Sequence, residues 1–220
     1  MSSTVLYTVN KEKTLGVSNC FANAWLYGPF IHEALWPKYG KRFSFAASSN
    51  EWDEIEERIL SSDDFENKIV YLSLACGFFH LKDKIKVGQA IISFANKNKS
   101  IDDSVKKRMI EVGKAIQSIE EDNVELFGLC INTASNYVIE AFNTGYDTFM
   151  KHAKEEFPDE EESFYEEYYE KMKEEFKDRK MYDDDTNYNP LVVVDIDEND
   201  KINIENLSDY YNRQKKQHNK

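Results

Sequence analysis

The alternation of apolar and polar residues predicts strands near both ends of the chain. The segment "TVLYTV" (4–9) alternates and is rich in β-branched side chains, as in a half-buried strand. "LVVVDI" (191–196) reads in the same way, and the polar residues "DENDK" separate it from the alternating segment "KINIENL". Residues 191–207 therefore predict a β-hairpin with a turn built from Asp and Asn.

Continuous apolar runs predict strands that are buried on both faces. "KIVYLSLA" (68–75), followed by "GFFHL" (77–81), predicts the central strand, and "VELFGLCI" (124–131) predicts a neighbour. "RFSFAAS" (42–48) predicts a further strand. We expect "KIVYLSLA", "VELFGLCI" and "LVVVDI" to share one sheet, because each is too apolar to face water on both sides.

Apolar residues at helical spacing predict several helices between these strands. The stripes that define them are Phe21, Ala22, Trp25 and Leu26; Ile31, Ala34 and Leu35 after Pro29; Trp52, Ile55 and Ile59 after the capping pair Ser48 and Glu51; Val87, Ala90, Ile91, Phe94 and Ala95; and Val105, Met109, Val112, Ile116 and Ile119 after Ser100. Residues 137–157 are also expected to be helical.

The order of these elements predicts an α+β fold, because helices and strands do not alternate regularly. We expect a single mixed or antiparallel sheet of about five strands, with helices packed mainly on one face and an added acidic amphipathic helix. Residues 1–220 then form one domain, with 155–185 as an acidic helical insertion and 211–220 as a polar tail.

Charge narrows the range of partners. The net charge of −13 disfavours direct binding to nucleic acid or to an anionic membrane surface and favours a basic protein partner. The longest nearly continuous apolar run has 13 residues, so no transmembrane helix is expected. The first residues do not resemble a secretory signal, and the three separated cysteines fit buried reduced thiols; both features predict a cytoplasmic protein.

The common catalytic motifs are missing from the sequence. The eight glycines are never closer than 11 residues, which excludes a P-loop and a dinucleotide fingerprint. The four histidines lack metal-ligand spacing, and His80 is interpreted as a hydrogen-bonded core histidine. No cofactor and no small-molecule substrate are predicted, and an enzyme whose active site is dispersed along the sequence stays as an alternative.

The segment "DIDENDKINIEN" partly matches a calcium-binding loop. Asp195, Asp197, Asn199 and Ile202 stand at the positions that such a loop requires. Asp200 replaces the essential glycine, however, and the twelfth position, where a bidentate acid is needed, is occupied by Asn. We therefore predict a hairpin turn and no calcium site.

Most of the negative charge lies in one segment that also carries aromatic residues. Residues 155–185 contain fifteen acids and five bases, a net charge of −10 out of −13. Within it, Phe164, Tyr168, Met172 and Phe176 recur at every fourth position, which predicts an amphipathic helix after Pro158. Two interpretations remain open: the stripe packs on its own domain, or the aromatics and carboxylates together bind a partner.

These features predict a non-enzymatic binding or inhibitor protein, similar in kind to immunity or anti-defence proteins, that neutralises a basic protein. A DNA mimic that inhibits a nucleic-acid-binding protein is the second alternative, beside the dispersed enzyme. The predicted partner-binding residues are Phe164, Tyr165, Glu166, Glu167, Tyr168, Tyr169 and Glu170.

Overall fold

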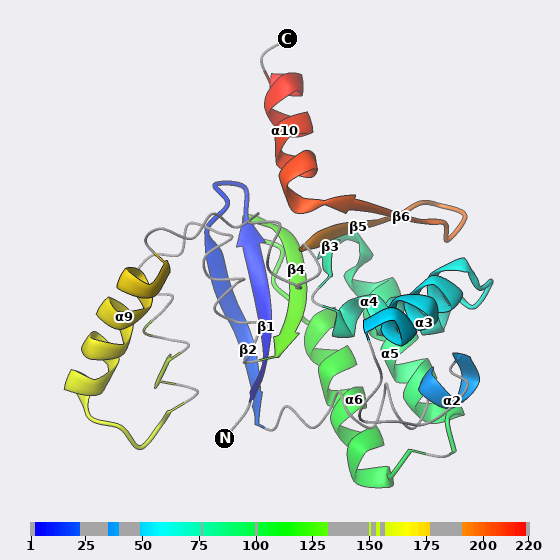
Figure 1. The fold of residues 1–220 in the computed structure, drawn as a ribbon, viewed down its shortest axis with the longest axis horizontal. Helices are drawn as coiled ribbons and strands as arrows, with labels where there is room; N and C mark the ends of the chain where they lie inside the picture. The colour runs from blue at the N-terminus through cyan, green and yellow to red at the C-terminus, as the bar shows by residue number, and fades with distance from the viewer. Residues whose placement is uncertain are drawn as a thin grey trace.

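A computed structural model describes residues 3–22, 35–39, 49–75, 77–99, 101–131, 150, 153–154, 157–176 and 191–218 (Figure 1). The elements in chain order are β1 (Ser3–Asn10), β2 (Leu15–Ala22), α2 (Trp36–Tyr39), α3 (Ser49–Ser61), α4 (Phe65–Leu74), β3 (Phe78–His80), the 3₁₀ turn η3 (Leu81–Asp83), α5 (Lys84–Lys97), α6 (Asp103–Gln117), β4 (Val124–Ile131), α9 (Glu162–Phe176), β5 (Val192–Ile196), β6 (Ile202–Asn206) and α10 (Leu207–His218).

The six strands form one mixed sheet in the order β2-β1-β4-β3-β5-β6. β3 and β5 run parallel, and the other neighbouring pairs are antiparallel. The predicted α+β class with a single mixed sheet is therefore confirmed. Within the described residues, no helix is long and apolar enough to cross a bilayer.

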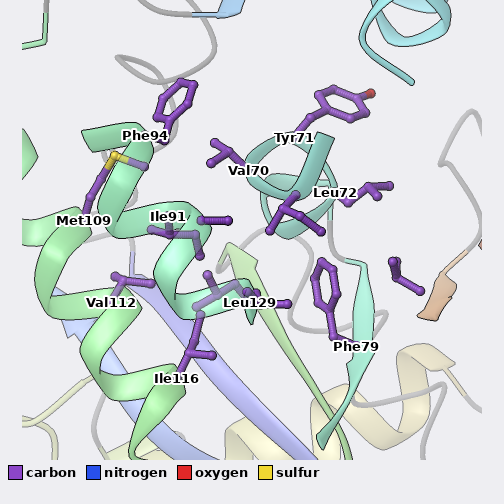
Figure 2. Packing of buried hydrophobic residues seen from close by; sticks show 14 of the residues in the cluster. Val70, Tyr71, Leu72, Phe79, Ile91, Phe94, Met109, Val112, Ile116 and Leu129 are labelled. Carbon is purple, nitrogen blue, oxygen red and sulfur yellow. The ribbon is translucent and has the colours of Figure 1, made fainter. Parts of the chain in front are cut away.

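Two hydrophobic clusters cover the two faces of the sheet. Helices α3 to α6 pack on one face, where Phe79 and Leu129 of the sheet meet Ile91, Val112 and Ile116 of the helices (Figure 2). On the other face, buried side chains of the strands contact Tyr165 of α9 and Leu207 and Tyr210 of α10; the strand residues are Val5, Tyr7, Val9, Leu15, Val17, Phe78, Leu126, Cys130 and Val193. α9 lies beside β2, away from α3 to α6, and α10 projects from the end of the sheet (Figure 1).

Several predicted elements are confirmed. β1, β4, the β5–β6 hairpin and helices α3, α5, α6 and α9 occupy the expected segments, and the stripes of α5 and α6 face the core. α6 begins at Asp103 and is capped by Asp102, which accepts a hydrogen bond from the Ser104 amide at 2.8 Å. The predicted strand 42–48 and most of the predicted helix 137–157 lie outside the described residues, as does Cys76. Cys20 and Cys130 are free thiols, as predicted; Cys130 is buried, whereas Cys20 is only half-buried.

The prediction of a central strand at "KIVYLSLA" is wrong, because these residues belong to helix α4. Asp64 caps this helix by accepting a hydrogen bond from the Asn67 amide at 3.0 Å. Consecutive residues 69–73 are all buried, since α4 is enclosed by the sheet and by neighbouring helices. A helix that is buried on all sides gives the same continuous apolar run as a buried strand, and the cap is the signal that distinguishes them.

The predicted helix beginning near Phe21 is also wrong where the structure describes it, because Phe21 and Ala22 belong to β2. A β-bulge lies here: Leu6 pairs with Asn19, whereas the next residue, Tyr7, pairs with Val17. The bulge adds one residue, so Val17 and Cys20 contact the same hydrophobic cluster at a spacing of three. Phe21, a residue of the predicted helical stripe, packs against the cluster on the helical side of the sheet. The predicted polar tail from 211 is helical as far as His218.

Helices α5 and α6 cross at two glycines. A Cβ atom on Gly113 would lie 2.7 Å from the Gly88 carbonyl oxygen and 2.6 Å from Cγ1 of Ile92. A Cβ atom on Gly88 would meet the Gly113 carbonyl oxygen at 2.5 Å. The backbones of the two helices are therefore in contact, and the two glycines allow this short distance between α5 and α6.

Replacing Gly113 by valine should lower the free energy of unfolding by about 2–3 kcal/mol, because the added atoms overpack the helix crossing. Urea unfolding monitored by circular dichroism measures the change. Lys114→Val on the exposed side of the same helix is the control and should change stability by less than about 0.5 kcal/mol. Equal effects of the two substitutions would contradict the backbone contact.

Candidate functional site

The seven residues predicted to bind a partner all lie on α9, and the structure divides them into buried and exposed sets. Tyr165 is only 4% exposed. Phe164, Tyr168 and Tyr169 are half-buried, whereas Glu166, Glu167 and Glu170 are exposed. The two interpretations of the stripe can therefore be assessed separately for its aromatic and acidic members.

The aromatic members pack on the protein itself. The Tyr165 hydroxyl donates a hydrogen bond to the Phe157 carbonyl oxygen at 2.6 Å. The Phe157 ring meets Phe164 and Tyr168 edge-on, with centroids 5.4 and 5.7 Å apart, and the latter two rings stack at 5.8 Å. Tyr165 also joins the cluster on the sheet. This packing fixes α9 to its own domain, so the burial of Tyr165 favours the intramolecular interpretation for that residue.

The acidic members Glu166, Glu167 and Glu170 face solvent. Glu166 and Glu167 form no ion pair with any described residue. Other acids are paired with a lysine or arginine within 3 Å, both on α9, where Glu162 pairs with Lys154, and on other elements: Asp64, Glu66, Glu121, Asp195, Asp200 and Glu205. The exposed side of α9 is thus a fixed anionic surface.

The β5–β6 hairpin takes the place of the calcium loop, as predicted. Asp197 accepts hydrogen bonds from the Asn199 and Lys201 amides, both at 2.8 Å, and closes the turn. Asp200 adopts a left-handed φ of 60°, which Asp tolerates better than most residues. Its carboxylate pairs with a lysine of α5 at 2.7 Å. Within the described residues, no group of three or more His, Cys, Asp or Glu side chains is arranged to hold a metal ion.

A second candidate site is a polar cleft of about 640 Å³ between the sheet and α10, called here the α10 cleft. It is lined by Lys11, His80, Glu125, Asp195, Tyr210, Arg213 and Gln214. His80 and Asp195 come from the carboxyl ends of the parallel strands β3 and β5. Ligands of α/β sheets commonly bind at such strand ends.

A β-bulge brings Glu125 into the α10 cleft. Val9 of β1 pairs with Leu126, but the next residue, Asn10, pairs with Val124, so Glu125 is the extra residue. Strict alternation from Leu126 would direct Glu125 toward the helical layer. Instead its carboxylate accepts hydrogen bonds from the Tyr210 hydroxyl at 2.5 Å and the Gln214 amide at 2.6 Å on the α10 side.

Helix α10 supplies the opposite wall of the cleft. The Gln214 amide also donates to the Tyr210 hydroxyl at 2.7 Å, which closes a three-membered network with Glu125. Burial and the bond to Glu125 raise the pKa of Tyr210, so its hydroxyl stays protonated. Arg213 lies over the Tyr210 ring at 5.4 Å and binds both carboxylate oxygens of Glu205, at 3.2 and 2.7 Å.

His80 carries an imidazole that is neutral at physiological pH. Burial lowers its pKa below the ordinary value of 6.5, although the nearby Asp195 carboxylate acts in the opposite direction. The Asp195 carboxylate is itself held ionised, because the hydrogen bond from Lys82 at 2.6 Å lowers its pKa. The His80 ring meets Tyr210 edge-on at 5.5 Å, and no described residue forms a hydrogen bond with it. The ring is half-buried, and the interpretation of His80 as a hydrogen-bonded core histidine stays a prediction.

Sequence reasoning did not bring the cleft residues together. Lys11, His80 and Glu125 belong to separate segments, and the others come from β5 and α10. A signal was present in Glu125, a charged residue at the start of an otherwise apolar strand, and in Tyr210 and Gln214, which stand four residues apart on one helix face. The sequence predicts a polar tail at 211–220, whereas Leu207–His218 form helix α10.

No protein-family model, curated protein or solved structure matches this chain. The function is therefore inferred from the residues and their geometry.

Replacing Tyr165 by alanine should lower the free energy of unfolding by about 3–5 kcal/mol, because the substitution empties a buried aromatic position. Tyr165→Phe, which loses only the hydroxyl bond to Phe157, should cost about 1 kcal/mol. Thermal and urea unfolding provide both values. A stability close to wild type for Tyr165→Ala would show that α9 is not held by this side chain.

Acidification should weaken the fold through His80. Because its pKa is lower in the folded than in the unfolded chain, the unfolded chain binds more protons as the pH falls through 6.5 toward the folded pKa. The contribution of neutral His80 to the free energy of unfolding is complete above pH 6.5 and is lost as the pH falls from 6.5 to the folded pKa. Urea unfolding at several pH values should show this slope in wild type and a smaller slope in His80→Gln, and an NMR titration should place the imidazole midpoint below 6.5. A midpoint above 6.5 would contradict the buried environment.

Proposed function

We propose that this protein is a non-enzymatic binding protein that neutralises a basic protein partner through the exposed acidic side of α9. The observation that supports this proposal is the division of α9 into a buried aromatic side and an exposed side bearing Glu166, Glu167 and Glu170. Because the aromatic side fixes the helix, the three carboxylates are held on a common support before a partner arrives. Such preorganisation lowers the entropic cost of association.

The charge distribution favours a cationic partner. Residues 155–185 carry a net charge of −10, and Glu166 and Glu167 have no ion pair among the described residues. An uncompensated field of one sign accelerates the encounter with an oppositely charged surface. Tyr168 and Tyr169 are half-buried, so their accessible edges can add apolar contact at the margin of the same surface.

Proteins with strongly basic surfaces include enzymes that bind nucleic acid. An inhibitor of such an enzyme, comparable to an immunity or anti-defence protein, is therefore the narrower form of the proposal. The DNA-mimic alternative requires carboxylates distributed in two rows along an extended surface, whereas residues 155–185 carry −10 of the net charge of −13. The arrangement favours docking by a compact acidic face.

The test compares three purified baits in extracts of the cells that make the protein: wild type, Glu166→Lys/Glu167→Lys/Glu170→Lys, and Glu57→Lys/Glu111→Lys/Glu120→Lys. The second triple variant changes exposed acids away from α9 and produces the same change in net charge. A basic protein retained by wild type and the control, but lost from the α9 variant, is the expected result. Its association rate should fall about tenfold or more in the α9 variant at low salt.

Equal losses in both triple variants would show that only net charge matters, and equal retention by all three would remove α9 from the interface. Either result overturns the proposal. Competition with duplex DNA distinguishes a DNA mimic from an inhibitor that docks outside the nucleic-acid groove. A partner whose groove is occupied by α9 should release the protein as DNA is added, whereas a partner bound elsewhere should retain it.

A further inference from the structure

We infer that the α10 cleft is a binding site for a small zwitterion, of which a free α-amino acid is the simplest class. The cleft is formed by residues of β3, β4, β5 and α10 together with Lys11, and none of its lining residues belongs to α9. This inference therefore does not depend on the acidic surface proposed above. Its volume of about 640 Å³ is sufficient for a ligand of this size.

The lining of the cleft is balanced in charge. Lys11 and Arg213 supply two cationic groups, and Glu125 and Asp195 supply two anionic groups. Since burial lowers the pKa of His80, its imidazole adds no charge at neutral pH. A ligand that carries one positive and one negative group matches both kinds of lining residue at the same time.

Each charged side chain retains binding capacity after its contacts within the described residues are counted. Arg213 uses Nε and one terminal nitrogen for Glu205, Asp195 uses Oδ1 for Lys82, and Glu125 uses Oε1 for both of its donors. Lys11 is exposed and has no hydrogen-bond or ion-pair partner among the described residues. The cleft therefore offers cationic donors for a carboxylate and carboxylate oxygens for an ammonium group.

Other ligand classes fit this lining less well. A purely anionic ligand would place its charge near Glu125 and Asp195, and a purely cationic ligand would meet Lys11 and Arg213. An apolar ligand would remove water from four charged groups without replacing the lost hydrogen bonds. A zwitterion avoids these costs because it compensates both signs in one molecule.

The fixed network around Glu125 adds geometric selectivity. Tyr210 is 2% exposed, and its hydroxyl holds one oxygen of Glu125 in place, as does the Gln214 amide. The neutral His80 ring presents a nitrogen that can accept a hydrogen bond from an ammonium group. The anionic end of the site is thus rigid, whereas Lys11 is exposed and can adjust its position around the carboxylate of the ligand.

The first experiment screens the twenty common α-amino acids at millimolar concentration against the full chain, using ¹H–¹⁵N chemical shifts of the cleft residues, and measures the strongest binder by calorimetry. At least one amino acid should shift the amides of His80, Glu125 and Gln214. Its N-acetyl derivative and its methyl ester, each lacking one charge, should bind at least about tenfold more weakly, which corresponds to the loss of one charge contact. Failure of all twenty to bind, or equal binding of the blocked derivatives, overturns the inference.

Variants then assign binding to the cleft. Lys11→Gln and Asp195→Asn each remove one charge from an exposed or half-exposed side chain, and each should weaken binding about tenfold. Glu198→Gln on the exposed hairpin turn is the matched control and should leave the affinity unchanged. The triple lysine variant of α9 should also bind the amino acid normally. Unchanged affinity in both cleft variants would contradict the site.

Discussion

The pairing of β4 with β1 and β3 is the interaction on which the whole molecule depends. β4 connects the β1–β2 hairpin to the β3–β5–β6 part of the sheet, so its loss would divide the sheet in two. Its residues also pack into both hydrophobic clusters. Phe127 and Leu129 face the helical layer, and Leu126 and Cys130 face the opposite side of the sheet. Gly128 allows this central position, because a Cβ atom there would lie 3.0 Å from the Gly77 carbonyl oxygen.

The same strand explains how a charged group enters an apolar part of the fold. The bulge at Glu125 interrupts the alternation at the start of β4, close to solvent. Tyr210 and Gln214 then satisfy the carboxylate, so the burial of Tyr210 against the sheet is coupled to a polar network. The position of α10 is consequently determined by hydrogen-bond geometry as well as by apolar contact.

The sequence predicted those parts of the fold whose periodicity is local. β1 and the final hairpin follow from alternation, β4 from a continuous apolar run, and helices α3, α5, α6 and α9 from helical spacing. It did not predict α4, because an enclosed helix lacks a polar face, or the end of β2, because Phe21 and Ala22 also fit helical spacing with Trp25 and Leu26. The exposed acids of α9 could be chosen from spacing alone. The α10 cleft could not, since register and bulges decide which distant side chains meet.

The wide separation of the cleft residues along the chain has a consequence for folding order. Lys82 and Asp195, the ion pair beside the cleft, are 113 residues apart, and Glu125 and Gln214 are 89 apart. Closing loops of this length costs more chain entropy than forming local helices and hairpins. A chain in which only β1–β2 and α5–α6 had formed would therefore have no cleft. A molecule that occupied the cleft would distinguish completed chains from incomplete ones, and its binding energy would add to the stability of the completed form only.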